Sequence, residues 1–157
     1  MTFTVTSTGF TDGSTLPDAQ VYAKSNRSPQ LSWSGAPEGT RSFAITCFDP
    51  DAPTGSGFWH WTVANIPADV TALAEGASSA GLPTAAVEGR TDFGPPGFGG
   101  AAPPQGHGPH RYIFTVFAVD AERLDVTPDS SGAIFGFNLH FHTLARASIT
   151  GIYENRG

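Results

Sequence analysis

The chain has little of several features that would each place a protein in a particular class. It contains one cysteine, Cys47, among 157 residues, so it has neither an intramolecular disulfide nor the paired cysteines of a structural zinc site. No apolar run approaches the roughly 18 residues that a membrane-spanning helix needs. The beginning, "MTFTVTSTGF", lacks the basic and apolar regions of a secretion signal. We therefore expect a cytoplasmic protein with no integral membrane segment.

Positive charge is also scarce. Lys and Arg number 8 against 14 Asp and Glu, the formal net charge is −6, and the basic residues are scattered along the chain. Surfaces that bind nucleic acid or anionic membranes need clustered basic residues. We therefore expect no nucleic-acid partner, and any anionic ligand has to be held locally, in a pocket.

Glycine and proline, 19 and 13 residues respectively, are abundant and separate short apolar runs. Polar and apolar residues alternate in "TFTVTST", "QLSWS" and "SFAITCF", which is typical of β-strands, and the last run places Phe43, Ile45 and Cys47 on one face. The more fully apolar runs at 59–65 and 110–119 predict central strands buried on both faces. We expect a single, mostly β domain that spans residues 1–157.

A helical pattern occurs clearly once, in "FGFNLHFHTLARAS". Phe137, Phe141, Leu144, Ala145 and Ser148 fall there at i, i+4, i+7, i+8 and i+11, the spacing of one helix face. We expect this segment to form a short helix near the C-terminus, followed by a last strand in "SITGIY".

The segment 92–112, "DFGPPGFGGAAPPQGHGPHRY", is rich in glycine and proline. Gly97, Gly99 and Ala102 have the spacing of a dinucleotide fingerprint, but Pro103 and Pro104 remove donors from the helix that this motif requires. A disordered linker is a second interpretation. Because the segment runs directly into an apolar strand, we interpret it as a surface loop that delivers His110 to the start of that strand.

Two clusters of polar residues lie at the ends of predicted strands. Asp49 and Asp51 follow one strand and His60 lies in another; strand alternation directs His60 away from Trp59 and Trp61. In a third strand, His110 and Tyr112 are two positions apart, so these side chains share a face. If the strand ends converge, one region holds a carboxylate, two imidazoles and a phenol.

Each of these residues also has a structural interpretation. The aspartates precede prolines and favour turns, the histidine among tryptophans can be a buried residue bonded to a carbonyl, and the tyrosine can be a core aromatic. His107, His140 and His142 are interpreted as structural. His107 sits in a glycine-rich loop, and the other two sit in the predicted helix with no acid or cysteine at ligand spacing.

Four motifs in order make the chain resemble the phosphatidylethanolamine-binding protein family, and within it the bacterial Raf kinase inhibitor-like proteins. They are "DPDAP" at 49–53, "WHWTVANIP" at 59–67, "GPPG" at 94–97 and "GPHRY" at 108–112. The resemblance covers nearly the whole chain. It implies two packed antiparallel sheets with a short C-terminal helix, and a pocket for phosphate-type head groups or other small anions at one end of the large sheet.

The resemblance also implies which residues bind the ligand. They are Asp49, Asp51, His60, His110 and Tyr112, with a wall from Ala52 and Pro53 and a rim from Gly94, Pro95 and Pro96. In this family a cis peptide often precedes the proline at position 53. The imidazoles would donate hydrogen bonds to a phosphate as cations, a carboxylate behind an imidazole would fix its tautomer and favour its charged form, and the tryptophans would exclude water.

Two departures from the family pattern put lipid specificity and kinase inhibition in doubt. Trp59 stands where many animal members have a second histidine before His60, and the chain ends soon after its last strand. The alternative function is a protease or kinase inhibitor that acts through protein contacts, and a homodimer is left open. Two weaker alternatives are a hydrolase and a metal site of His60, His110 and Asp49. Nothing in the spacing of these residues demands a metal, and the chain lacks the Gly-x-Ser-x-Gly motif of a serine hydrolase. We expect a binding protein, not an enzyme, with no cofactor, no metal and no catalytic residue.

Overall fold

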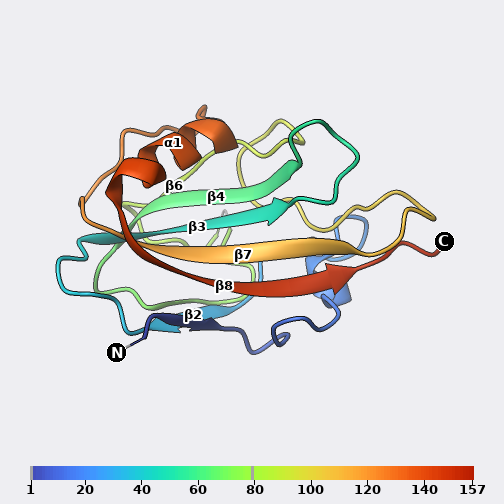
Figure 1. The fold of residues 1–157 in the computed structure, drawn as a ribbon, viewed down its shortest axis with the longest axis horizontal. Coiled ribbons are helices and arrows are strands. Elements are labelled where there is room, and N and C mark those ends of the chain that lie inside the picture. The colour runs from blue at the N-terminus through green and yellow to red at the C-terminus, as the bar shows by residue number, and fades with distance from the viewer. Residues whose placement is uncertain (1, 79) are drawn as a thin grey trace.

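The chain folds around two antiparallel β-sheets, as a computed structural model shows for residues 2–78 and 80–157 (Figure 1). The small sheet has the strand order β1-β2-β5 and the large sheet the order β6-β4-β3-β7-β8. The strands are β1 (Thr4–Thr6), β2 (Leu31–Ser34), β3 (Ser42–Asp49), β4 (Phe58–Pro67), β5 (Ala72–Leu73), β6 (Val87–Glu88), β7 (His110–Val119) and β8 (Thr143–Tyr153). A 3-10 helix, η1 (Asp18–Gln20), and one α-helix, α1 (Gly132–His142), complete the fold. The predicted mostly β fold is confirmed.

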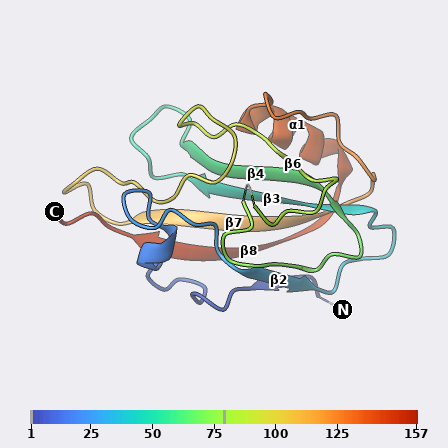
Figure 2. The ribbon, with the colours of Figure 1, turned by 180° about the vertical axis from the view of Figure 1, so that it is seen from behind.

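The large sheet lies between two apolar layers, with the small sheet on one side and α1 on the other (Figures 1 and 2). On the first side, Phe43, Ile45 and Cys47 of β3 pack with Trp33 of β2 in the main core. On the second side, Ala44 of β3 belongs to a smaller cluster with residues of α1. Because both faces are covered, β3 is buried almost throughout, which explains why its sequence is apolar at successive positions.

The helix differs from its prediction in extent and in orientation. It ends at His142, and β8 begins at the next residue, so Leu144 and Ser148 belong to a strand. The helix buries Phe135 and Leu139, whereas Phe137 and Phe141 are each 65% exposed. The predicted apolar face was therefore wrong, because its spacing joins residues of a helix to residues of the strand that follows it.

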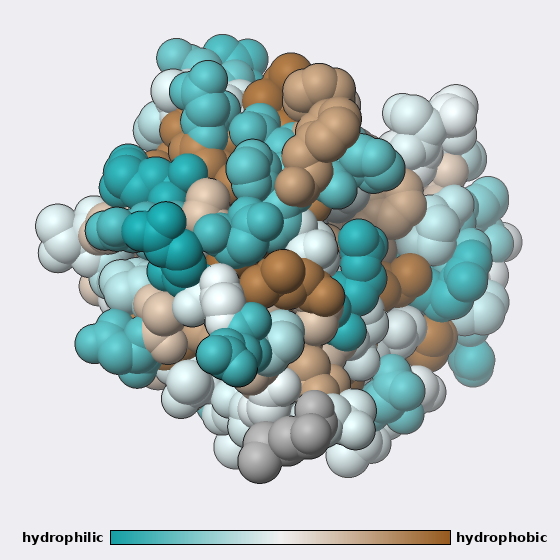
Figure 3. All heavy atoms as spheres, turned by 60° about the vertical axis from the view of Figure 1, so that its left-hand side comes forward, coloured by the Kyte–Doolittle hydropathy of each residue, from teal (hydrophilic) through white to brown (hydrophobic). Residues whose placement is uncertain are grey.

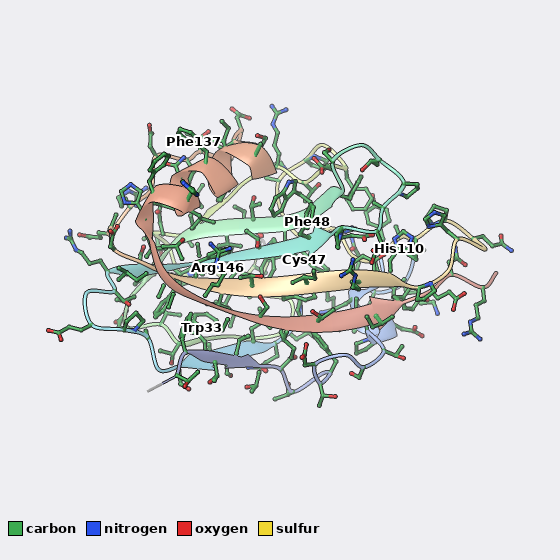
Figure 4. The ribbon with its side chains drawn as sticks, in the orientation of Figure 1. Trp33, Cys47, Phe48, His110, Phe137 and Arg146 are labelled. Carbon is green, nitrogen blue, oxygen red and sulfur yellow. The ribbon has the colours of Figure 1, made fainter. Side chains whose placement is uncertain are left out.

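The exposed face of α1 carries a group of apolar side chains. Ile134, Phe137, Phe141 and Leu144 are all exposed, and the Phe137 and Phe141 rings contact each other edge to face at 5.3 Å between centroids. Figure 4 shows Phe137 pointing away from the sheet, and apolar side chains reach the surface in the upper part of Figure 3. In the part of the chain that the structure describes, no helix is long and apolar enough to cross a membrane.

Candidate functional site

Three strand ends meet at one end of the large sheet. β3 ends at Asp49, which pairs in register with Phe58 at the beginning of β4. β7 begins at His110 on the other side of β3, and Figure 4 shows His110 at this end of the sheet. Antiparallel pairing thus brings together two motifs that are about 60 residues apart in the chain. The convergence that the sequence left as a condition is present.

A β-bulge in β4 determines the direction of His60. Cys47 pairs with Trp61 and the next residue of β3, Phe48, pairs with Trp59, so His60 is an extra residue without a partner in the register. Trp61 consequently lies in the main core, while Trp59 packs near α1 on the opposite face, where its ring approaches Gly132. His60 therefore shares a side with Trp61, contrary to the alternation expected from the sequence. The bulge depends on pairing with β3, and the sequence of β4 alone does not reveal it.

Asp49 and His110 form a buried pair at the floor of this region. The Oδ2 atom of Asp49 accepts a hydrogen bond of 2.7 Å from Nδ1 of His110, and the two residues are only 2% and 1% exposed. The other carboxylate oxygen, Oδ1, accepts a hydrogen bond from the backbone N–H of Asp51 at 2.7 Å. Both oxygens of the buried carboxylate are thus satisfied, and the carboxylate fixes a proton on Nδ1 of His110.

His107, which the sequence suggested was structural, contacts the same histidine. Its Nδ1 lies 2.6 Å from Nε2 of His110, and the two rings meet edge to face with centroids 4.8 Å apart. Asp49, His110 and His107 therefore form a hydrogen-bonded chain from a buried carboxylate to an exposed imidazole. The two histidines of "HGPH" are three positions apart, which was the available signal, but the loop conformation decides whether two such rings meet.

The second imidazole of the site is held by a backbone carbonyl. Nδ1 of His60 donates a hydrogen bond of 2.7 Å to the carbonyl oxygen of Gly99. Burial lowers the pKa of His60 below its ordinary value of 6.5, although the Gly99 carbonyl and the Asp49 carboxylate act in the opposite direction. Since a carbonyl oxygen only accepts, the neutral ring carries its proton on Nδ1 and a lone pair on Nε2.

Tyr112 brings a hydroxyl group to the same region. Its ring meets that of His60 edge to face at 5.2 Å between centroids, and the residue is 1% exposed. Within residues 2–78 and 80–157, the Tyr112 hydroxyl makes no hydrogen bond of good geometry, although the Asp49 carboxylate and the Ala102 backbone lie close enough to influence its pKa. Burial raises the pKa of Tyr112, and the Asp49 carboxylate raises it further, so the phenol keeps its proton. A buried hydroxyl without a partner is unusual in a folded protein and marks a place where a ligand can supply one.

One pocket, with a volume of about 200 Å³, is lined by Asp49, His60, His110 and Tyr112. Its remaining walls are mainly apolar and come from the loops around the strand ends: Ala52, Pro53, Thr54, Phe58, Phe93, Ala102 and Pro104. Ala52 and Pro53, which the sequence predicted as a wall of the site, are among these lining residues. The predicted role of the tryptophans is wrong, because the aromatic walls are Phe58 and Phe93, whose rings contact each other at 4.8 Å between centroids.

Asp51 lies outside the pocket lining, contrary to its predicted role there. Its carboxylate accepts hydrogen bonds of 2.9 Å from the backbone N–H, Nε and Nη2 of Arg111. This bidentate contact lowers the pKa of Asp51 to about 2. Asp51 therefore fastens the loop after β3 to the start of β7. The sequence missed this role because "HRY" places Arg111 between two pocket residues, on the opposite face of the strand.

The predicted rim of Gly94, Pro95 and Pro96 also lies outside the pocket lining. These residues form a turn in which the Pro95 carbonyl accepts a hydrogen bond from the Thr91 N–H, and Gly94 has a φ of 120° that favours glycine. The turn instead presents Phe93 to the pocket. The peptide before Pro53 is trans, since the described residues contain no cis peptide bond, and none of their His, Cys, Asp and Glu side chains form a group of three suited to a metal.

Known proteins share this arrangement of sequence and fold. The protein-family description "Phosphatidylethanolamine-binding protein" matches residues 6–154. The YbhB protein of Escherichia coli (strain K12) is 53% identical over 150 residues, which cover 91% of this chain and 94% of YbhB. The crystal structure of E. coli YbcL, described as a new member of the mammalian PEBP family, is 51% identical with a TM-score of 0.95, and the match covers 97% of this chain and 98% of YbcL. A putative phosphatidylethanolamine-binding protein homolog from Chlamydia trachomatis is 29% identical with a TM-score of 0.84, covering 98% of this chain and 97% of that one.

Proposed function

Because this chain belongs to the phosphatidylethanolamine-binding protein family, we propose that it binds a small oxyanion, such as the phosphate of a head group, in the pocket at the end of the large sheet. One observation carries this proposal: the buried Asp49–His110 pair, His60 and the unpartnered Tyr112 hydroxyl all line the same small pocket. Polar groups that converge within apolar walls are typical of small-molecule sites.

The size of the pocket limits the ligand. Its volume of about 200 Å³ is below the roughly 300–1,000 Å³ of pockets that enclose drug-sized molecules, so a head group fits and a larger ligand extends into solvent. The apolar walls weaken competition from water, which strengthens each polar contact inside.

Hydrogen bonds occupy both oxygens of the one carboxylate in the pocket lining. The Asp49 carboxylate accepts from the Asp51 N–H and from Nδ1 of His110. Arg111 is engaged by Asp51 on the other face of the strand and supplies no donor to the pocket. The ligand is therefore held by hydrogen bonds, without a free cationic side chain in the pocket lining, and we expect modest affinity with specificity from geometry.

The one cysteine of the chain lies in the main core, outside the pocket lining, and is poorly suited to act as a nucleophile. Cys47 is buried, and burial raises the pKa of its thiol well above the ordinary value, which disfavours the thiolate that a nucleophile requires. We propose a cytoplasmic binding protein without enzymatic activity. An inhibitor of a protease or kinase, and a homodimer, stay predictions.

Two-dimensional NMR of the histidine side chains tests the proposal. Inorganic phosphate and phosphorylethanolamine are titrated into the protein at constant pH and ionic strength. We expect the imidazole signals of His60 and His110 to move along one saturable curve. His142 is an internal control, because it also contacts a carboxylate, with its Nδ1 2.8 Å from Oδ1 of Asp120, but lies outside the pocket.

The result that contradicts the proposal is equally direct. If the signals of His142 move with those of His60 and His110, the effect of the anion is not specific to the pocket. If none of them moves at millimolar ligand, the pocket does not bind these anions.

A further inference from the structure

The hydrogen bond that Nδ1 of His60 donates determines that the other ring nitrogen, Nε2, is a hydrogen-bond acceptor. Nδ1 donates to the Gly99 carbonyl, and among the described residues Nε2 has no hydrogen-bond partner. The buried ring is neutral near physiological pH, because burial lowers its pKa. Nε2 therefore offers a lone pair at the pocket and demands a donor from whatever binds there. This differs from the cationic donor that the sequence predicts for His60.

Tyr112 supplies the complementary group next to this acceptor. Its hydroxyl is protonated, buried and unpartnered, and its ring lies against that of His60. A phenol is a good donor to an anionic oxygen. The floor of the pocket thus presents an acceptor and a donor side by side, and a ligand that satisfies both carries an X–O–H group beside an X–O⁻ or X=O oxygen.

We propose that the pocket selects an oxyanion in its singly protonated form, above all a phosphomonoester monoanion, whose P–O–H donates to Nε2 of His60 while another oxygen accepts from Tyr112. This inference rests on the proposed function and narrows its ligand class. A phosphodiester has the same charge of −1 but no P–O–H group, so it leaves the buried acceptor without a partner. The intact head group of phosphatidylethanolamine is such a diester, and the protein accordingly prefers a monoester to it.

Other ionisable groups act on His60 and have to be separated from its effect. Asp49 and Asp92 are the carboxylates that influence the ring, Tyr112 lies against it, and His110 with His107 lies across the pocket. Titration of any of these groups changes the affinity of every anion that enters. The ratio of two affinities, for anions of equal charge that differ only in the P–O–H group, cancels this shared effect.

Isothermal titration calorimetry with methyl phosphate and dimethyl phosphate measures that ratio. The experiment is run from pH 5 to pH 8 at constant ionic strength. An unsatisfied buried acceptor corresponds to about 5- to 150-fold in affinity. At pH 6.5, where His60 is mainly neutral because burial lowers its pKa, we therefore expect methyl phosphate, counted as its monoanion, to bind at least about 5-fold more tightly than dimethyl phosphate. A phosphomonoester loses its second proton with a pKa of about 6. Above that pH the ratio of the affinity for methyl phosphate to that for dimethyl phosphate should therefore decrease, by a factor that approaches ten for each pH unit.

A variant reverses the preference. In His60→Gln the side-chain amide can present N–H to the pocket, so we expect dimethyl phosphate to gain relative to methyl phosphate and the ratio to fall towards one. His142→Gln is the matched control and keeps the ratio of the parent, since this histidine lies outside the pocket. If His60→Gln does not fold, the two-ligand series on the parent protein still decides.

The possible results separate this inference from the proposed function. Methyl phosphate that binds with a falling ratio above pH 6 supports both. Binding of both ligands, in competition with each other, with a ratio that is flat from pH 5 to pH 8, overturns the inference and leaves the anion site in place. If neither methyl phosphate nor dimethyl phosphate binds, the proposed function is overturned. A short-chain phosphatidic acid, which is a lipid monoester, distinguishes a lipid source from a soluble one by binding more tightly or more weakly than methyl phosphate.

Discussion

Removing one oxygen atom, in Tyr112→Phe, should raise stability and lower ligand affinity together. The hydroxyl is buried and has no partner in the described part of the chain. A buried polar group without a partner costs about 1–3 kcal/mol. Because the phenylalanine ring keeps the contacts of the tyrosine ring, we expect the free energy of unfolding to stay equal or to rise by up to that amount.

The same change should weaken binding. A hydrogen bond to a charged group contributes about 1.5–3 kcal/mol, which corresponds to about 10- to 150-fold in the dissociation constant. His110 variants are less informative, because they leave the Asp49 carboxylate buried without its partner and destabilise the protein for that reason. A variant that is at least as stable as the parent but binds the ligand more weakly would indicate that the Tyr112 hydroxyl serves binding and not stability.

Urea denaturation without ligand and calorimetry with methyl phosphate measure the two quantities. Tyr153→Phe is the matched control, because this tyrosine lies outside the pocket lining and should leave affinity unchanged. The reasoning is refuted if Tyr112→Phe lowers the free energy of unfolding by more than about 1 kcal/mol, the worth of a typical satisfied hydrogen bond. It is also refuted if the affinity for methyl phosphate is unchanged.

Three further predictions concern the frame of the site. Arg111→Ala frees Asp51, whose folded-state pKa of about 2 lies below its ordinary value, so the stability that this ion pair contributes is present above about pH 4 and is lost as pH falls through 2. Because the pair is solvent-exposed, we expect a small loss of stability at pH 7 that disappears towards pH 2, measured by urea denaturation against pH. The Cys47 thiol, buried with a raised pKa, should react with a thiol reagent only as fast as the protein unfolds. Gly132→Ala places a methyl group against the indole ring on β4 and should cost about 1–3 kcal/mol, whereas Gly136→Ala, which has open space, should gain up to about 1 kcal/mol.

Each of these predictions has a result that contradicts it. The ion-pair account fails if the difference between parent and Arg111→Ala is as large at pH 2 as at pH 7. Labelling of Cys47 within seconds under native conditions would mean an accessible thiol and would reopen a nucleophilic role. Equal melting temperatures for the two glycine variants would mean that α1 is not packed as closely on the sheet as the structure describes.

Local sequence patterns determined the elements and part of the site. The direction of successive side chains along a strand is a local property of the backbone, so the alternation in "SFAITCF" placed Phe43, Ile45 and Cys47 together in the core. The same rule placed His110 and Tyr112 on one face, and both line the pocket. The ordered motifs indicated the family, and with it the two sheets and the region where the strand ends meet.

Only the tertiary structure decided how the polar groups are used. The bulge at His60 arises from pairing between β3 and β4, and it moves Trp59 to the helix side and turns His60 into the pocket. The Gly99 carbonyl, 39 residues away in sequence, then makes this imidazole an acceptor. The contact between Asp51 and Arg111 likewise joins residues 60 positions apart. Hydrogen-bond partners are chosen among groups that folding brings together, and neither their spacing nor the protonation state that they impose is written in the local pattern of the chain.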